Sequence, residues 1–304
     1  MQWYECLDEK IRDYLPDMTV ERDVPMSRHT SFRIGGPARR MAFPESREQL
    51  VILLGLAEEC GIRPFLLGRG TNLLVSDRGL DTLVIKTAER MTSIRRLGDV
   101  TLEADAGVLL SRLAVYAQQA GLAGLEFAFG IPGTVGGAVY MNAGAYGGEI
   151  KDVLTAVTFL DENLHLQTLP VQELQLGYRT SIFERCSWCI LEAEFTLHPG
   201  DAQEIHTAMQ EYMRRRKEKQ PLEYPSAGST FKRPVGQFAG KLIEDCGLRG
   251  FRVGGAAISE KHCGFVVNLG NATCADVVSL TEQVRQIVLE KTGCTLEREI
   301  RVVE

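Results

Sequence analysis

The stretch of sequence that decides the fold is residues 130–150, GIPGTVGGAVYMNAGAYGGEI. Its Ile, Val, Tyr and Met residues make it too apolar for a linker, and its seven glycines weaken both helix and strand. We therefore expect neither an ordinary helix nor an ordinary strand here. Seven glycines also cost more conformational entropy than a plain turn requires, so we expect this bare backbone to pack against a bound group.

A second glycine turn precedes it at residues 67–75, LGRGTNLLV. It is not a dinucleotide fingerprint, because Leu73 occupies the third glycine position and another strand-like run follows. Residues 236–242, GQFAGKL, fail as a phosphate-binding P-loop, because Leu242 stands where a magnesium-binding Ser or Thr is needed.

Both glycine segments can still present backbone N–H groups where a Cβ would block them, which is a donor array suited to a pyrophosphate. Side-chain donors are available at Thr71, Asn72 and Thr134. For residues 68–72 an alternative stays open at this point, namely a tight turn between two strands with no ligand.

Length and composition indicate an ordinary soluble protein. With 304 residues, two or three packed units are expected. A net charge of −6 speaks against a nucleic-acid coat but not against a small anion held by local Arg and Lys. The N-terminus lacks the apolar core of a signal peptide, and no apolar run approaches the ~20 residues of a membrane span. We expect a cytoplasmic protein without membrane insertion.

The chain has eight cysteines, of which only Cys186 and Cys189 have suggestive spacing. No second pair and no His at ligand spacing accompany them, so we expect reduced, mostly buried thiols and no metal.

The apolar pattern predicts an α+β protein in three parts. Residues 1–90 read as a small α/β unit, with a strand over 31–44 broken by two glycines and a helix that Ser46 caps. Residues 91–200 read as short strands with one helix around 108–120, and a helix over 202–219 opens the last part, 201–304. The final strand is a candidate to return to the first part.

Six motifs follow one another with compatible spacing from about residue 29 to the C-terminus. They are HTSFRIGGPA (29–38), LGRGTNLLV (67–75), GIPGTVGGAVYMNAGAYG (130–147), YRTSIF (178–183), SAGSTFKRP (226–234) and LEREIR (296–301). Each motif alone is weak, but the set resembles the UDP-N-acetylenolpyruvoylglucosamine reductase family. The sequence resembles the shorter variety of the family, because no insertion with an extra tyrosine follows Arg179.

This resemblance implies a two-subdomain FAD-binding region of the vanillyl-alcohol-oxidase type and a separate C-terminal α/β substrate-binding domain. It also implies FAD and NADPH as cofactors, UDP-N-acetylglucosamine enolpyruvate as the substrate, a role in cell-wall precursor synthesis, and a monomer without a nucleic-acid partner. The implied cofactor-binding residues are Gly68, Arg69, Gly70, Thr71, Asn72, Gly130, Gly133, Thr134, Gly136, Gly137, Asn142 and Gly144.

Three catalytic residues are implied by their places in the motifs. Arg179 corresponds to the family's arginine at the enolpyruvyl carboxylate, where a guanidinium can offer paired donors. Ser229 corresponds to the proton donor, and Glu299 to the glutamate that polarises the substrate. The implied substrate-binding residues are Tyr178, Lys232 and Arg233, the last of which often is Asn in the family.

From the residues alone, each of these roles has a plainer alternative. Arg179 can be a surface arginine on a loop, and Ser229 can be a helix N-cap or a turn serine. Strand alternation places Glu297 and Glu299 on one face, so spacing does not choose between them. Two other functions also stay open, a flavoprotein oxidase that uses oxygen and a nucleotide-sugar-binding regulator without turnover.

Overall fold

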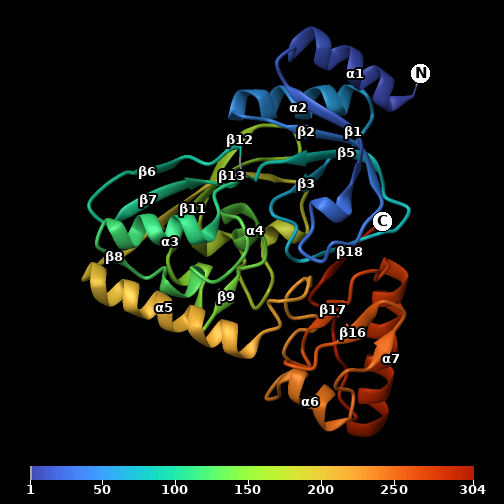
Figure 1. Ribbon diagram of the computed structural model, residues 1–304. Helices are drawn as coiled ribbons and strands as arrows, with labels where there is room; N and C mark the ends of the chain where they lie inside the picture. The colour runs from blue at the N-terminus through green and yellow to red at the C-terminus, as the bar shows by residue number, and fades with distance from the viewer. Residues whose placement is uncertain (1, 89) are drawn as a thin grey trace. The chain divides into compact units, whose positions relative to one another are not determined.

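The computed structural model describes residues 2–88 and 90–304 (Figure 1). Its contacts divide the chain into two compact units. Unit 1 consists of Met1–Arg22, Arg40–Arg69 and Thr82–Arg215. Unit 2 consists of Asp23–Arg39, Gly70–Asp81 and Arg216–Glu304. The chain therefore passes between the units several times before it ends in unit 2.

Two helices cover one end of unit 1, α1 (Trp3–Tyr14) and α2 (Arg47–Glu59), and Figure 1 shows them side by side in blue. The Ser46 hydroxyl accepts a hydrogen bond from the Gln49 N–H at 3.2 Å, as predicted for the N-cap of α2. The leucines of α2 and Leu7 of α1 are buried in one apolar cluster. Helix α1 is also tied to the neighbouring strand, because the Asp8 carboxylate accepts two 2.8 Å hydrogen bonds from the nearly buried Arg40 guanidinium.

Most of a four-stranded sheet belongs to unit 1, with the order β1-β2-β5-β3. Its strands are β1 (Thr19–Pro25), β2 (Pro37–Phe43), β5 (Leu80–Lys86) and β3 (Phe65–Leu67). Strands β3 and β5 pair in parallel, which places the end of β3 and the glycine turn after it next to the end of β5. The strand predicted over 31–44 begins only at Pro37, and β1 was not predicted.

The larger sheet of unit 1 is antiparallel, with the order β12-β11-β13-β7-β6. Its strands are β12 (Leu166–Pro170), β11 (Leu154–Leu160), β13 (Cys189–Thr196), β7 (Thr101–Asp105) and β6 (Ile94–Arg96). Helix α3 (Leu110–Gln119) packs its leucines and alanines against this sheet in the largest apolar cluster of the chain.

The glycine stretch contains regular structure, so the expectation that it forms no ordinary helix was wrong. Helix α4 (Val135–Tyr140) has Thr134 as its N-cap. The short strands β9 (Gly144–Ala145) and β10 (Gly148–Glu149) follow it in the sequence and pair with each other. The helix forms despite two glycines because Val135 and Val139 are fully buried. Tertiary packing here outweighs the low helix propensity of glycine.

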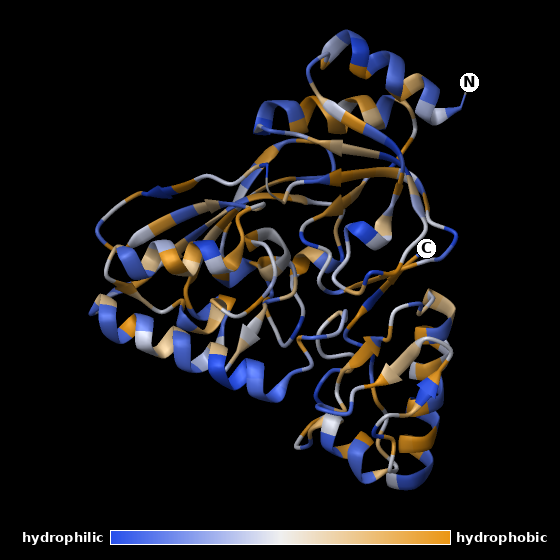
Figure 2. Cartoon of the chain, viewed as in Figure 1, coloured by the Kyte–Doolittle hydropathy of each residue, from blue (hydrophilic) through white to orange (hydrophobic). Residues whose placement is uncertain are grey.

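Helix α5 (Ala202–Lys219) has the predicted bounds. Figure 2 shows it as mostly hydrophilic, and only Ile205 and Met209 of this helix are buried. Strands β8 (Leu122–Ala123) and β14 (His198–Pro199) pair just before it begins. The described residues also form five short 3₁₀ helices: η1 (Met26–Arg28), η2 (Glu126–Ala128), η3 (Ile150–Asp152), η4 (Val171–Glu173) and η5 (Ile182–Glu184).

Unit 2 has a three-stranded antiparallel sheet of β15 (Arg252–Val253), β16 (Ala256–Ile258) and β17 (Val266–Asn268). Helix α7 (Cys274–Thr292) packs on this sheet and on α6 (Ala239–Asp245), with Val277, Leu280 and Val284 fully buried. The Asp77 carboxylate accepts hydrogen bonds from the first N–H groups of α7, which stabilises the positive end of the helix.

The last strand, β18 (Arg301–Val303), pairs in parallel with β4 (Leu73–Val75) within unit 2. The Ser76 N–H extends this pairing by donating to the Val303 carbonyl at 2.8 Å. The second glycine turn, which leads into β4, is therefore held beside the C-terminal strand.

All eight cysteines are free thiols. Burial raises the pKa of the Cys189 thiol to about 12, so it stays protonated at neutral pH. Over residues 2–88 and 90–304, no cluster of three or more His, Cys, Asp or Glu side chains is arranged to hold a metal ion. None of the helices described for these residues has the length and apolarity needed to span a membrane.

Candidate active site

The two predicted cofactor-binding turns meet inside unit 1, at Gly68 and Thr134. A Cβ on Gly68 would lie 2.5 Å from the Thr134 Oγ1 atom, which is closer than real Cβ contacts allow. Thr134 is the N-cap of α4, and its nearly buried hydroxyl accepts a hydrogen bond from the Gly137 N–H at 3.3 Å. The glycine at position 68 is thus what lets the first turn approach the start of α4.

The first N–H groups of α4 are used within the protein. The Val135 N–H donates to the Val108 carbonyl at 2.8 Å, and the Gly136 N–H donates to the Ala106 carbonyl at 2.9 Å. These groups do not form the donor array that the sequence predicts for an anion. The Thr134 hydroxyl accepts one bond and keeps a proton that it can donate, so it is a suitable group for a phosphate oxygen.

Three glycines of the stretch make room for protein atoms. A Cβ on Gly136 would lie 2.8 Å from the Ala106 Cβ, and one on Gly148 would lie 2.6 Å from the Phe127 ring. A Cβ on Gly144 would lie 2.7 Å from the Gly148 carbonyl oxygen. Close packing of α4, β9 and β10 within unit 1 therefore explains part of the glycine content.

The rest of the first glycine turn belongs to unit 2. Gly70 has a φ of +67°, and a Cβ there would lie 2.2 Å from the His29 carbonyl oxygen. The Asn72 side chain donates to the Glu299 carbonyl oxygen at 3.0 Å, and the Arg301 N–H donates to the Asn72 carbonyl at 2.9 Å. A residue predicted to bind the cofactor is thus bonded to the backbone of a residue predicted to be catalytic.

Arg179 lies in unit 1 at the tip of a tight turn between Gly177 and Thr180. Its guanidinium donates to the Gly144 carbonyl at 3.0 Å and lies 5.2 Å from the centre of the Tyr178 ring. Tyr178, which is predicted to bind the substrate, is 45% exposed. The guanidinium is thus anchored to the glycine stretch, in which the cofactor-binding residues are predicted.

Unit 2 brings the two other predicted catalytic residues together, although 70 positions separate them in the sequence. The Glu299 N–H donates to the Thr230 carbonyl at 2.9 Å, and Ser229 precedes Thr230 in the same extended segment. Ser229 is exposed and Glu299 is half-buried. A hydroxyl and a carboxylate therefore occur on adjacent extended segments.

The alternative carboxylate, Glu297, lies two residues before Glu299 in the sequence. Its side chain is 71% exposed and accepts a hydrogen bond from the Lys232 ammonium at 2.6 Å. The Arg233 guanidinium lies 4.7 Å from the centre of the exposed Phe238 ring. Glu297 and Lys232 thus form a surface ion pair, whereas Glu299 lies closer to Ser229 in the pairing.

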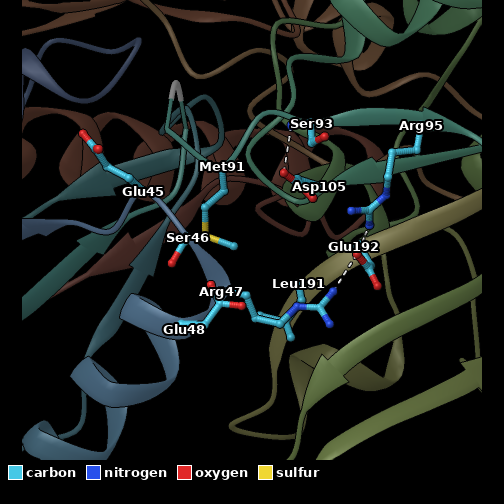
Figure 3. Close-up of a pocket in the computed structure, with 10 residues that line it drawn as sticks. All are labelled: Glu45, Ser46, Arg47, Glu48, Met91, Ser93, Arg95, Asp105, Leu191 and Glu192. Carbon is cyan, nitrogen blue, oxygen red and sulfur yellow. Dashed lines mark hydrogen bonds and ion pairs between the residues drawn. The ribbon is translucent and has the colours of Figure 1, made fainter.

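A pocket of about 420 Å³ in unit 1 contains none of the predicted site residues (Figure 3). Figure 3 shows two guanidinium groups that point toward the buried Glu192 carboxylate, with N···O distances of 2.6 Å from Arg47 and 2.8 Å from Arg95. Two cations compensate this buried charge, and removing both would leave the carboxylate buried without a charged partner.

Two residues that support the Arg179 turn were not predicted from the sequence. The Ser181 hydroxyl, which is 2% exposed, donates to the Tyr140 carbonyl at 2.6 Å. The Glu149 carboxylate accepts a hydrogen bond from the Asn142 amide at 3.0 Å. Glu149 is the only charged residue of the 130–150 stretch, and this was a signal for its role.

Two family models match the chain. One is described as an FAD binding domain and matches residues 38–169. The other is described as the C-terminal domain of UDP-N-acetylenolpyruvoylglucosamine reductase and matches residues 220–303. The predicted fold class, α+β with an FAD-binding region and a separate C-terminal domain, is confirmed.

The chain is similar over its length to proteins named UDP-N-acetylenolpyruvoylglucosamine reductase. The protein from Caldanaerobacter subterraneus subsp. tengcongensis is 48% identical over 301 residues, which are 98% of each chain. The one from Geobacillus kaustophilus is 45% identical and covers 100% of this chain and 99% of its own. The crystal structure of the enzyme from Thermus caldophilus has a TM-score of 0.82 at 38% identity, covering 94% of this chain and 100% of that one.

Proposed function

Because the chain belongs to the UDP-N-acetylenolpyruvoylglucosamine reductase family, we propose that it reduces UDP-N-acetylglucosamine enolpyruvate to UDP-N-acetylmuramate with NADPH, for peptidoglycan precursor synthesis. It is a flavoprotein oxidoreductase. The structural observation that carries the proposal is the pairing of the Glu299 and Thr230 backbones, because it brings a carboxylate to the segment of Ser229. The cytoplasm, where nucleotide sugars are made, is the proposed location.

The residues at the two glycine turns fit FAD. The Thr134 hydroxyl, which lies against the backbone of Gly68, can donate a hydrogen bond to one phosphate oxygen. When bound there, FAD would supply the chemistry of hydride transfer between NADPH and the enolpyruvyl group. The proposed FAD-binding residues remain Gly68, Arg69, Gly70, Thr71, Asn72, Gly130, Gly133, Thr134, Gly136, Gly137 and Gly144, with Asn142 considered separately below.

The three catalytic residues have distinct tasks in this reaction. Hydride addition to the vinyl carbon places negative charge on the substrate carboxylate and the adjacent carbon. The Arg179 guanidinium stabilises the carboxylate through paired donors, since its charge does not depend on pH. The Ser229 hydroxyl donates the proton to the adjacent carbon, and the Glu299 carboxylate orients and polarises the substrate. Tyr178, Lys232 and Arg233 are proposed to contact the nucleotide sugar.

A visible absorption spectrum tests this function directly. The purified protein should be yellow, NADPH should bleach the flavin under anaerobic conditions, and the enolpyruvyl sugar nucleotide should then restore the flavin absorption. Restoration by oxygen alone, with no effect of the sugar nucleotide, would show an oxidase instead. A colourless preparation that takes up no added FAD would refute the proposal.

Replacing Gly68 with Ala should weaken FAD binding about 10- to 100-fold, because the new methyl group must displace the Thr134 hydroxyl at a cost of about 1–3 kcal/mol. Flavin fluorescence during dilution measures the dissociation constant. Gly98→Ala is the matched control, since a Cβ there meets only the Thr101 hydroxyl, at 3.9 Å. Equal FAD affinity in both variants would contradict the proposed phosphate position.

Replacing Glu299 with Gln should lower substrate-dependent turnover by about 10²-fold, whereas Glu297→Gln should change it less than about threefold. Both changes remove one carboxylate charge from the same extended segment, which precedes β18. Steady-state turnover at saturating NADPH distinguishes them. A larger loss in the Glu297 variant would reassign the catalytic carboxylate.

A further inference from the structure

We propose that Asn142 is a positioning residue, whose side chain fixes the turn that carries Arg179 and, together with Glu149, sets the position of the guanidinium. This inference rests on the proposed function, because it takes Arg179 as the group at the substrate carboxylate. It gives Asn142 a task different from binding FAD. Residues 142–151 and 177–181, which make the contacts described below, all belong to unit 1.

The turn that carries Arg179 needs support from its surroundings. The Gly177 N–H donates to the Thr180 carbonyl at 3.1 Å, and the Thr180 N–H donates back to the Gly177 carbonyl at 3.4 Å. Arg179 lies at the tip with a φ of +55°, a conformation that costs a residue with a side chain about 1 kcal/mol or more. A free loop would relax, so other contacts must hold this arginine in place.

The Asn142 side chain provides one of these contacts. It is completely buried, and its Nδ2 atom donates to the Gly177 carbonyl at 2.9 Å and to the Glu149 Oε2 atom at 3.0 Å. Its Oδ1 atom accepts from the Lys151 N–H at 3.0 Å. Because two acceptors face one end of the amide and a donor faces the other, only one orientation satisfies all three partners.

The backbone of Asn142 holds the other end of the arginine. The Arg179 Nη2 atom donates to the Gly144 carbonyl at 3.0 Å, and Nη1 donates to the Asn142 carbonyl at 3.4 Å. Asn142 itself has a φ of +43°, which Asn adopts more readily than most residues. Residue 142 therefore binds the turn with its side chain and the guanidinium with its carbonyl.

Glu149 completes the arrangement by fixing the amide of Asn142. The Lys151 ammonium lies 2.8 Å from its carboxylate and, with the Asn142 hydrogen bond and the nearby Arg179 charge, keeps the Glu149 pKa below its ordinary value. The carboxylate is therefore ionised at neutral pH and remains an acceptor for the amide. The negative charge of Glu149 also attracts the positive Arg179 guanidinium nearby.

Two half-reactions separate a positioning role from a cofactor-binding one. Asn142→Asp keeps the size of the side chain but places a second carboxylate against Glu149 and the Gly177 carbonyl. Reoxidation of the reduced flavin by the enolpyruvyl sugar nucleotide should slow by about 10²-fold, the usual consequence of a shift near 1 Å in a reacting group. FAD retention and flavin reduction by NADPH should stay within about twofold, because they do not involve Arg179. Stopped-flow absorbance measures both steps.

Asn163→Asp is the matched control, since it makes the same chemical change at an exposed hairpin residue and should leave both steps unaltered. If Asn142→Asp does not fold, Glu149→Ala takes its place, with an expected loss of about tenfold in the substrate step only. Loss of FAD from a folded Asn142→Asp variant would assign Asn142 to the cofactor site and overturn the inference. Equal slowing of both half-reactions, or an unchanged substrate step, would overturn the inference. A wild-type enzyme that the sugar nucleotide fails to reoxidise would instead refute the proposed function.

Discussion

Replacing Ser229 with Ala is expected to slow the reoxidation of reduced flavin by UDP-N-acetylglucosamine enolpyruvate by about 10³-fold, within the 10²–10⁴ that a positioned proton donor contributes. The hydroxyl is lost, and water must protonate the substrate carbon instead. FAD binding and flavin reduction by NADPH should persist, because Ser229 is exposed and its removal leaves the core of unit 2 intact. Stopped-flow absorbance resolves the two steps.

The control for this experiment is Ser226→Ala, three residues earlier in the same motif. The Ser226 backbone carbonyl accepts a hydrogen bond from the Ser31 hydroxyl at 2.7 Å, and this bond does not involve the side chain that is replaced. Its substitution should therefore leave both half-reactions within about twofold of wild type. Unchanged substrate reduction in Ser229→Ala would show that another group donates the proton.

Replacing Arg179 with Lys should lower the substrate half-reaction by about 10²–10³-fold, the range found when one donor to a developing negative charge is removed. Lysine keeps the charge, but it lacks the planar pair of donors that fits a carboxylate, and it cannot donate to two carbonyls while facing the substrate. Apparent affinity for the enolpyruvyl sugar nucleotide should fall as well.

Arg185→Lys tests whether the effect belongs to this position. Arg185 is an exposed residue that ends the 3₁₀ helix η5 shortly after the turn, and the change should alter turnover less than about twofold. Comparable losses in the two variants would mean that arginine in this region acts through stability or general charge. A loss confined to Arg179→Lys supports direct contact with the carboxylate.

The secondary structure could be predicted where local signals are strong. The Ser46 cap predicted the start of α2, and helix α5 has the bounds expected from the turn at Pro199-Gly200 and from Gln220-Pro221 after its end. Helix α4 was missed because Gly136 and Gly137 disfavour a helix locally, whereas its first N–H groups are paired with carbonyls of residues 106 and 108. That pairing depends on residues almost thirty positions away, which periodicity does not reveal.

The sequence suffices to propose the residues of the candidate site, but not how they are arranged. Alternation could not choose between Glu297 and Glu299, whereas the structure pairs Glu297 with the Lys232 ammonium. The bond from Asn142 to the Gly177 carbonyl spans 35 positions and depends on the tertiary fold. The role of Glu149 is similar, because a lone acid among glycines only acquires meaning beside the amide that it fixes.

The parallel pairing of β18 with β4 has a consequence for biosynthesis. During translation, residues 73–75 leave the ribosome more than 220 positions ahead of residues 301–303, their partners. The nascent chain must therefore keep an apolar strand edge unpaired until residues 301–303 have been made, and this exposes the edge to misassociation. A chain that stops before residue 301 would lack β18, so β4 would keep an unpaired edge.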